Sequence, residues 1–323
     1  MAFQTPITAK SALEAVQRHD YALPAIQREF VWSTDQICML FDSLLRGYPI
    51  GSFLFWKVKA ENSQKFVFYD FIRAYHQRNS PHCQTLALAA PRDLTAILDG
   101  QQRLTALNIG LFGSHAEKLP RKHWNNAAAY PVKELYLDLN HEADDEELGF
   151  FYKFRFLTAA EASSPSDGEH WYRVKEVIQL EDGLPMMKYV QQNELDEPAY
   201  TALYQLHHAV HAEPAISFYE EGNQELDDVL HIFIRLNSQG TPLSHSDLLL
   251  SIGLHTFRHS CASIMFRRGV PKEAIRRLLG HHSWDFTAGT YLHLGDDDLP
   301  DGSVVDDLTA TAVAKEGVTV LQA

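Results

Sequence analysis

The stretch LTAILDGQQRLTALNIGL, residues 94–111, carries a strand, a tight turn and a helix in succession. Residues 94–98 are a short apolar run that predicts a buried strand. The turn follows as Asp-Gly-Gln-Gln-Arg, residues 99–103, after which leucines recur at the spacing of one helix face. A strand that passes through a tight turn into a helix directs free backbone N–H groups at an anion. The stretch therefore predicts mixed helix and strand structure with an anion site at the turn.

The residue types in this turn allow two interpretations. Gly100 permits a sharp turn and the close approach of a ligand, and Arg103 offers a planar fork that suits phosphate. Asp99 can hold a metal ion or orient a water molecule. In the alternative, Asp99 is only a helix N-cap and Arg103 only a surface charge. The residues by themselves leave both interpretations open.

The flanking segments give further local predictions. Residues 33–36, Ser-Thr-Asp-Gln, form a capping-box pattern ahead of a helix that Gly47 ends. Residues 50–58 are rich in aromatic and branched side chains and predict a strand. We assign the aromatic residues between 53 and 75 to the core rather than to base stacking.

The middle of the chain gives fewer signals. Residues 134–139 predict a strand, 163–168 a loop, and 195–212 a helix. The helix carries His207, His208 and His211, but no HExxH-type carboxylate accompanies them, so we expect no metal site there. The acidic run 142–147 is typical of a solvated face or loop.

The composition is that of an ordinary soluble protein with room for two domains. The chain has 323 residues, of which 45% are apolar and 22% charged. No apolar run approaches the roughly 18 residues that span a bilayer, and the N-terminus lacks a charged-then-apolar leader. Cys38, Cys83 and Cys261 are scattered, as is usual in a reducing cytosol. We therefore expect a cytoplasmic protein without a membrane partner.

Charge is distributed unevenly along the chain. The formal net charge is −14, which is not typical of a nucleic-acid-binding protein. Residues 255–292 nevertheless form a local basic island, and an acidic stretch begins at Gly295. The composition changes near Ser251, where we place a domain boundary.

Four motifs occur in an order that identifies a family. They are LPAIQREFVW (23–32), IGSFL (50–54), ILDGQQRLT (97–105) and FIRLNSQGTPL (233–243). Together they resemble the N-terminal domain of GmrSD-type restriction systems, which is related to the ParB and sulfiredoxin fold. The resemblance covers roughly residues 10–251 and implies a role in phage defence, with a DGQQR centre associated with NTP hydrolysis and DNA nicking.

The resemblance also implies a site and its ligands. Asp99, Gln102 and Arg103 would be catalytic, and Gln27, Arg28, Gly100 and Gln101 would bind the nucleotide. The implied cofactor is an NTP, with GTP as one candidate, together with a divalent metal such as Mg²⁺; no separate protein metal site is assigned. The implied partners are DNA and either a separate nuclease subunit or a second copy of the chain. No GxxxxGK[ST] loop occurs, so NTP use would not be of the P-loop kind.

A second set of motifs lies beyond the boundary. HTFR (255–258), LLGH (278–281) and the late Tyr291 resemble the C-terminal half of a tyrosine recombinase catalytic domain of the phage integrase, Xer-like class. By this resemblance Tyr291 is the nucleophile, Arg258 binds the scissile phosphate, and His255 and His281 assist proton transfer. The family's further arginine and hairpin lysine have no counterpart here, and the loss of one such donor reduces a rate by about 10²–10³. We therefore predict that this segment is not a competent recombinase alone.

The sequence thus predicts three parts and three candidate functions. The fold is expected to be α+β: a ParB/sulfiredoxin-like mixed domain with helical additions over 1–251, a small α-helical recombinase segment over 252–298, and an acidic tail over 299–323 for which disorder is one expectation. The first function is a DNA-directed restriction-type protein with a DGQQR nucleotide site, of the NTP-dependent nuclease type if it is an enzyme. The alternatives are a DNA integration protein, incomplete by itself, and a non-catalytic DNA-binding fusion relic.

Overall fold

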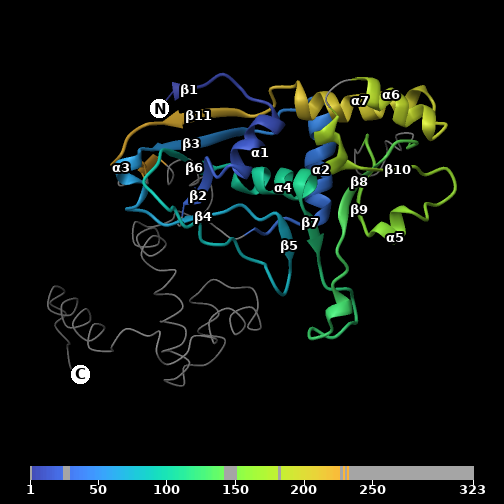
Figure 1. Ribbon diagram of the computed structural model, residues 1–323, viewed down its shortest axis with the longest axis horizontal. Helices are drawn as coiled ribbons and strands as arrows, with labels where there is room; N and C mark the ends of the chain where they lie inside the picture. The colour runs from blue at the N-terminus through green and yellow to red at the C-terminus, as the bar shows by residue number, and fades with distance from the viewer. Residues whose placement is uncertain are drawn as a thin grey trace, which may run out of the picture. The chain divides into compact units, whose positions relative to one another are not determined.

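The computed structural model describes residues 2–24, 30–141, 151–180 and 183–225, together with 228, 229, 231 and 232. These residues form an α+β structure, as the sequence predicts (Figure 1). The finer ParB and sulfiredoxin comparison stays a prediction. The predicted segments 252–298 and 299–323 lie outside the described residues.

The largest sheet has six strands in the order β1-β11-β3-β6-β2-β4. β11 pairs with β3 and β2 with β6 in parallel, whereas the other three pairings are antiparallel. The strand bounds are β1 (Ala2–Phe3), β2 (Tyr21–Pro24), β3 (Ser52–Val58), β4 (Phe68–Tyr69), β6 (Leu94–Asp99) and β11 (Ser217–Glu221). In the centre, Leu54 of β3 is opposite Asp99 of β6, and the register shifts between Leu54 and Phe55. The DGQQR turn thus emerges from the middle of the sheet, beside β3.

Two smaller sheets complete the strand structure. One is antiparallel, in the order β10-β8-β9, and the other is a parallel pair of β5 and β7. Their bounds are β5 (Ala74–His76), β7 (Ser114–Ala116), β8 (Glu134–Asp138), β9 (Phe154–Leu157) and β10 (Trp171–Arg173).

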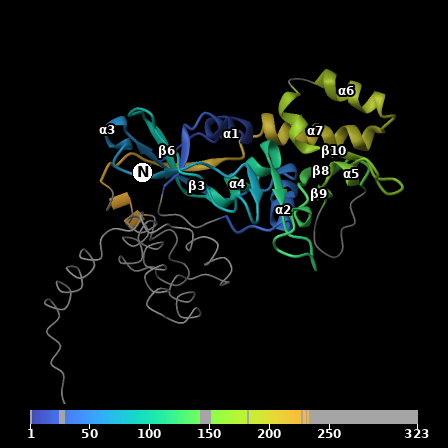
Figure 2. The same cartoon turned by 60° about the horizontal axis from the view of Figure 1, so that its bottom comes forward.

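A group of helices lies between the six-stranded sheet and the β10-β8-β9 sheet. Figures 1 and 2 show α2 in this intermediate position, and α2 contacts α4, α7 and β9. α4 also contacts α1 and the 3₁₀ helix η2. The helix bounds are α1 (Ala9–Gln17), α2 (Thr34–Leu45), α3 (Ala60–Ser63), α4 (Gln101–Phe112), α5 (Ala159–Ala162), α6 (Gly183–Gln192), α7 (Glu197–His211), η1 (Ala127–Ala129) and η2 (Val174–Gln179). Every residue of α4 from Leu104 to Leu111 is buried, so this helix lies in the core over most of its length.

The structure has a helix, α2, and a strand, β3, where the sequence predicts them. Ser33 caps α2 with both hydrogen bonds of a capping box, and Gly47 follows the helix end at φ +70°. The aromatic side chains of β3 are buried in the core. The strand begins at Ser52 and not at residue 50, because Gly51 takes a positive φ of 84° that no regular strand accommodates.

The later predictions also correspond to elements. Residues 134–138 form β8, and α7 occupies most of the predicted helix 195–212. In α7 the Nε2 atoms of His207 and His211 lie 3.0 and 2.9 Å from the carbonyl oxygens of Leu180 and Val177. These ring nitrogens therefore serve helix packing. The acidic run 142–147 lies outside the described residues, and no helix in the described part has the length and apolar character to cross a membrane.

Candidate functional site

The DGQQR turn forms where β6 passes directly into α4. β6 ends at Asp99, Gly100 takes the left-handed conformation with φ 89°, and α4 begins at Gln101. Gly100 is the N-cap residue and offers no side-chain capping bond. The interpretation of Asp99 as a simple N-cap is therefore wrong, because its carboxylate precedes the cap by one residue. The first turn of α4 receives no capping bond from Gly100 and carries the positive end of the helix dipole.

Gly100 is required by both the backbone and the packing. A Cβ atom at this position would lie 2.1 Å from Cδ1 of Phe53, and the positive φ is itself unfavourable for other residues. Phe53 belongs to β3 and is 1% exposed, so its ring cannot move aside without disturbing the core. The IGSFL and DGQQR motifs are thus in direct contact, although about 45 residues separate them in the sequence.

Arg103 joins the same two motifs from the helix side. Its Nη1 donates to the carbonyl oxygen of Ile50 at 2.6 Å, and its Nη2 donates to that of Ser52 at 2.9 Å. The guanidinium carbon lies 4.5 Å from the centre of the Phe53 ring. A Cβ on Gly51 would lie 2.3 Å from Nη1, so only glycine leaves room for this contact. The interpretation of Arg103 as a surface charge is therefore wrong: the side chain clamps the start of β3.

Arg103 also orients Asp99. Its Nη2 lies 3.2 Å from Oδ2 of Asp99, in an ion pair where the arginine side chain is 19% and the aspartate side chain 42% exposed. Burial lowers the pKa of the Arg103 guanidinium, and the nearby Asp99 carboxylate opposes that change. Oδ1 of Asp99 has no protein partner among the described residues. The turn therefore presents a carboxylate of fixed direction, partly open to solvent, next to the N-terminus of α4.

Gln102 connects the turn to the first motif of the chain. Its Oε1 accepts a hydrogen bond of 3.1 Å from the backbone N–H of Val31. Val31 comes shortly after Gln27 and Arg28 in the sequence, the two residues predicted to bind nucleotide. Gln27 and Arg28 themselves lie outside the described residues. Gln101 opens α4 and is half-buried. The structure thus brings the predicted residues 99–103 together in one turn and ties that turn to the segment after Arg28.

The described residues offer few ligands for a metal ion at this site. Within the described ranges, no three His, Cys, Asp or Glu side chains gather as a protein metal site would require. Asp99 therefore offers one carboxylate without two further such side chains beside it in the described ranges. A single carboxylate fits Mg²⁺ when substrate phosphates and waters supply the other ligands.

The recombinase residues cannot be located in the same way. His255, Arg258, His281 and Tyr291 lie outside the described residues, so their assigned roles stay predictions.

Sequence reasoning missed the part that β3 plays in the site. Ile50 and Ser52 supply carbonyl oxygens, and Gly51 supplies space, but none of the three carries a functional side chain. The one signal was the recurrence of glycine in two motifs that both border a strand. Contact between the motifs depends on the pairing of β3 with β6, which the separate motifs do not reveal.

Comparison with known families gives two matches. Residues 10–253 match the family described as GmrSD restriction endonuclease, N-terminal domain, and residues 226–297 match the phage integrase family. Both matches agree with the two resemblances seen in the motifs, and they overlap over residues 226–253.

Comparison with curated proteins finds an uncharacterized protein of Methanocaldococcus jannaschii. It is 33% identical over 140 residues, which make up 42% of this chain and 21% of that protein. The chain therefore spans about a fifth of the length of this relative.

Proposed function

The chain belongs to the GmrSD restriction endonuclease N-terminal domain family, and from this membership we propose that it is the nucleotide-using part of a DNA-directed, restriction-type defence system. The DGQQR turn, Asp99 to Arg103, is its nucleotide site. DNA is its macromolecular partner, in keeping with the family to which the chain belongs. A separate nuclease subunit and a second copy of the chain are the two candidate protein partners.

One observation carries the assignment of the site. Asp99 is held at Oδ2 by Arg103, while Oδ1 has no partner among the described residues and the side chain remains 42% exposed. Here half of the carboxylate is oriented and the other half is left for a ligand, at the end of a helix that favours anions.

The geometry divides the roles within the turn. The first turn of α4, which begins at Gln101, would face the phosphates of the nucleotide, because the positive end of the helix dipole lies there. Asp99 would hold a Mg²⁺ ion that, when bound, neutralises phosphate charge. Arg103 would act as a positioning residue, because its donors are engaged by Ile50, Ser52 and Asp99.

Equilibrium binding of a fluorescent GTP analogue tests this assignment. Wild type should bind the analogue with Mg²⁺ and lose that binding when EDTA removes the metal. Asp99→Asn keeps the shape of the side chain but removes its charge, so we expect Mg²⁺-dependent affinity to fall by about tenfold or more, which is about 1.4 kcal/mol.

Asp167→Asn is the matched control, because Asp167 is an exposed residue of the loop 163–168. This variant should bind as wild type does. Equal Mg²⁺-dependent affinity in Asp99→Asn and Asp167→Asn would contradict the assignment of Asp99.

DNA integration is the second candidate, and the integrase match over residues 226–297 favours it. A nicked duplex that traps a tyrosyl–DNA bond gives a direct test. Because the family's further arginine and lysine have no counterpart here, we expect wild type alone to form no covalent adduct. An adduct that appears in wild type and is absent in Tyr291→Phe would make the recombinase function the better account.

A further inference from the structure

A cavity of about 790 Å³ lies at the end of α4 that is remote from the DGQQR turn. Leu111 and Phe112, the last residues of α4, line it together with residues of β10, η2 and α6. The helix has 12 residues, so the cavity and the turn are about 18 Å apart along its axis. The volume falls in the range that encloses small molecules, about 300–1,000 Å³.

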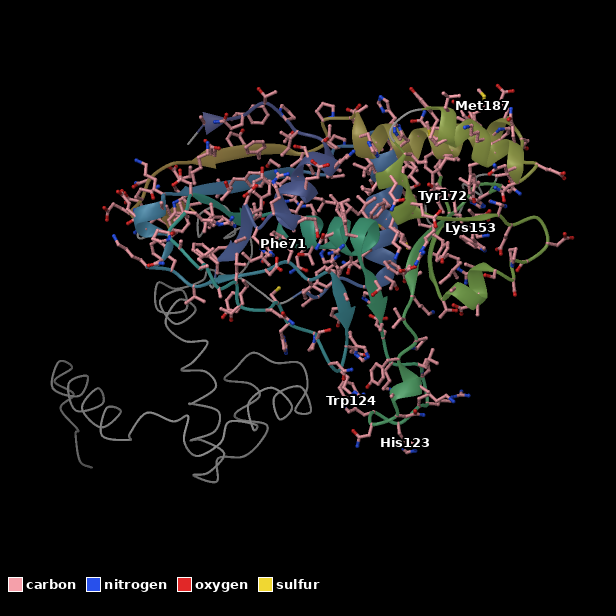
Figure 3. All side chains as sticks on the ribbon, viewed as in Figure 1. Phe71, His123, Trp124, Lys153, Tyr172 and Met187 are labelled. Atoms are coloured by element: carbon pink, nitrogen blue, oxygen red, sulfur yellow. The ribbon has the colours of Figure 1, made fainter. Side chains whose placement is uncertain are left out.

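Tyr172 belongs to the lining of this cavity and carries a buried hydroxyl group. The residue, labelled in Figure 3, is 2% exposed. Its hydroxyl has no hydrogen-bond partner among the residues that the structure describes. Burial raises the pKa of this phenol, so it remains a protonated donor at neutral pH. A buried hydroxyl is unfavourable unless something pairs with it. The neighbouring Tyr189 has its ring centre 5.1 Å from that of Tyr172. Its hydroxyl is hydrogen-bonded to Nε2 of His170 at 2.9 Å.

The lining is cationic although the chain as a whole is acidic. Four cationic side chains and one carboxylate, Glu176, border the cavity. Two of the cations, Arg173 and Lys175, are paired with Glu134. The other two are available: Arg73 uses Nε to donate to the carbonyl oxygen of Phe112 at 3.0 Å, and neither its terminal nitrogens nor Lys188 has a partner among the described residues.

Arg73 also compensates the partial negative charge at the C-terminal end of α4. The carbonyl end of α4 carries partial negative charge, which by itself would repel an anion. The bond from Arg73 to the Phe112 carbonyl neutralises that end and fixes the direction of the guanidinium, which lies 5.9 Å from the Phe112 ring centre. The terminal nitrogens are thereby oriented to donate two parallel hydrogen bonds to an acceptor such as phosphate.

We propose that this cavity binds a small phosphorylated ligand with a flat body, of mononucleotide size. Arg73, Lys188 and the hydroxyl of Tyr172 together supply the several donors that a phosphate group accepts. Phe112, Tyr172 and Tyr189 supply flat apolar surfaces, and the amides of Gln179 and Gln192 can pair with the edge of a base. The site is separate from the DGQQR turn and does not depend on the function proposed for that turn.

Calorimetric titration of the full chain with nucleoside 5′-monophosphates tests the proposal. We expect saturable binding at millimolar concentration or below, with weaker binding of the unphosphorylated nucleosides and of inorganic phosphate. Titration with a 5′-phosphorylated oligonucleotide shows whether the ligand is the end of a nucleic acid or a free nucleotide. Binding of either one supports the proposal, because both present a phosphate group next to a flat base.

Tyr172→Phe is the decisive variant, because it removes only the hydroxyl. We expect about tenfold weaker binding, the usual effect of losing a hydrogen bond to a charged group, and no loss of thermal stability without ligand because the hydroxyl is unpaired. Tyr204→Phe is the matched control, since Tyr204 is 43% exposed and lies outside the cavity lining. The double variant Arg73→Gln, Lys188→Gln should also lose binding.

Three results would overturn the proposal. The first is the absence of saturable binding of any nucleoside monophosphate by the folded chain. The second is unchanged affinity in both Tyr172→Phe and the double variant. The third is loss of binding in Asp99→Asn with retention in Tyr172→Phe, which would place the ligand at the DGQQR turn.

Discussion

Gly100 carries two requirements at one residue: a φ of 89° and the absence of a Cβ next to the ring of Phe53. Gly168 has a similar φ of 85°, but an added Cβ there would have nothing within 4 Å. A comparison of the two positions therefore distinguishes backbone strain from steric overlap with Phe53. We expect Gly168→Ala to destabilise the fold by about 1 kcal/mol from backbone strain alone. Gly100→Ala should lose a further 1–3 kcal/mol, roughly, from overpacking.

Chemical denaturation of the two glycine variants measures these effects. Equal losses of unfolding free energy in Gly100→Ala and Gly168→Ala would mean that Phe53 does not press against the turn.

Arg103→Lys tests whether this residue is a clamp. Lysine keeps the charge but cannot reach the carbonyl oxygens of both Ile50 and Ser52 with a planar fork. We expect a loss of about 1–3 kcal/mol in the free energy of unfolding, because a polar group of the buried Ile50 is left without its partner. Arg18→Lys, at a side chain that is 61% exposed, should change it by less than about 0.5 kcal/mol. A fully stable Arg103→Lys protein would return the arginine to a ligand-binding role.

His115 makes stability depend on pH. The residue is 2% exposed between the rings of Tyr75 and Phe156, and burial, with a smaller contribution from Lys133, lowers its pKa from 6.5 to about 4. Between pH 6.5 and about 4, this histidine is therefore protonated in the unfolded chain and neutral in the folded chain. The contribution is complete above pH 6.5 and is lost as pH falls towards 4, in total about 3 kcal/mol.

The pH dependence of unfolding in His115→Gln and in the exposed His123→Gln gives the comparison. His115→Gln should flatten the decline of stability between pH 6.5 and 4, and His123→Gln should retain it. Burial raises the pKa of the neighbouring Glu117, which acts in the opposite sense, but this carboxyl is common to both variants. Identical slopes in the two variants would show that His115 titrates normally.

At the scale of residues, the sequence predicted which residues form the turn but not the contacts that each of them makes. Asp99 and Arg103 were identified as a carboxylate and a guanidinium in one turn, but their ion pair was not predicted. The carbonyl partners of Arg103 lie some 50 residues earlier on β3, and local spacing contains no information on such contacts.

At the scale of elements, the segments with strong local signals formed as predicted. The capping box of α2 and the apolar run of β6 are determined by neighbouring residues, so the sequence suffices for both. β11, in contrast, pairs in parallel with β3 about 165 residues away, and its outer neighbour is the two-residue β1. Such an element depends on tertiary pairing more than on its own composition.

The cap of α2 gives the prediction for this scale. Ser33→Ala removes the side-chain acceptor for the N–H of Gln36. The return bond, which the backbone N–H of residue 33 donates to Oε1 of Gln36, then remains as the one half of the capping box. We expect a loss of about 1 kcal/mol in unfolding free energy, with Ser33→Gly losing less. Thermal or chemical unfolding of both variants measures it, and an unchanged Ser33→Ala protein would mean that packing of α2 alone sets its start.

At the scale of the whole molecule, two family matches meet within one chain. The first covers residues 10–253 and includes every helix and strand described here except the start of the chain, whereas the second covers residues 226–297. Motif order was sufficient to predict this arrangement, because each motif set is specific by itself. The function of the combination follows from the DGQQR turn in our account, since that turn is the site with a fixed and partly open carboxylate.

The most direct test of that claim is nucleotide turnover by the purified full chain, with Mg²⁺, in the presence and absence of DNA. Our account predicts Mg²⁺-dependent hydrolysis of a nucleoside triphosphate by wild type and by Asp167→Asn. In folded Asp99→Asn it predicts a fall of about a hundredfold, the scale of losing one preorganised group that stabilises charge. Absence of turnover with every common nucleoside triphosphate in folded wild type, or equal turnover in Asp99→Asn, would contradict it.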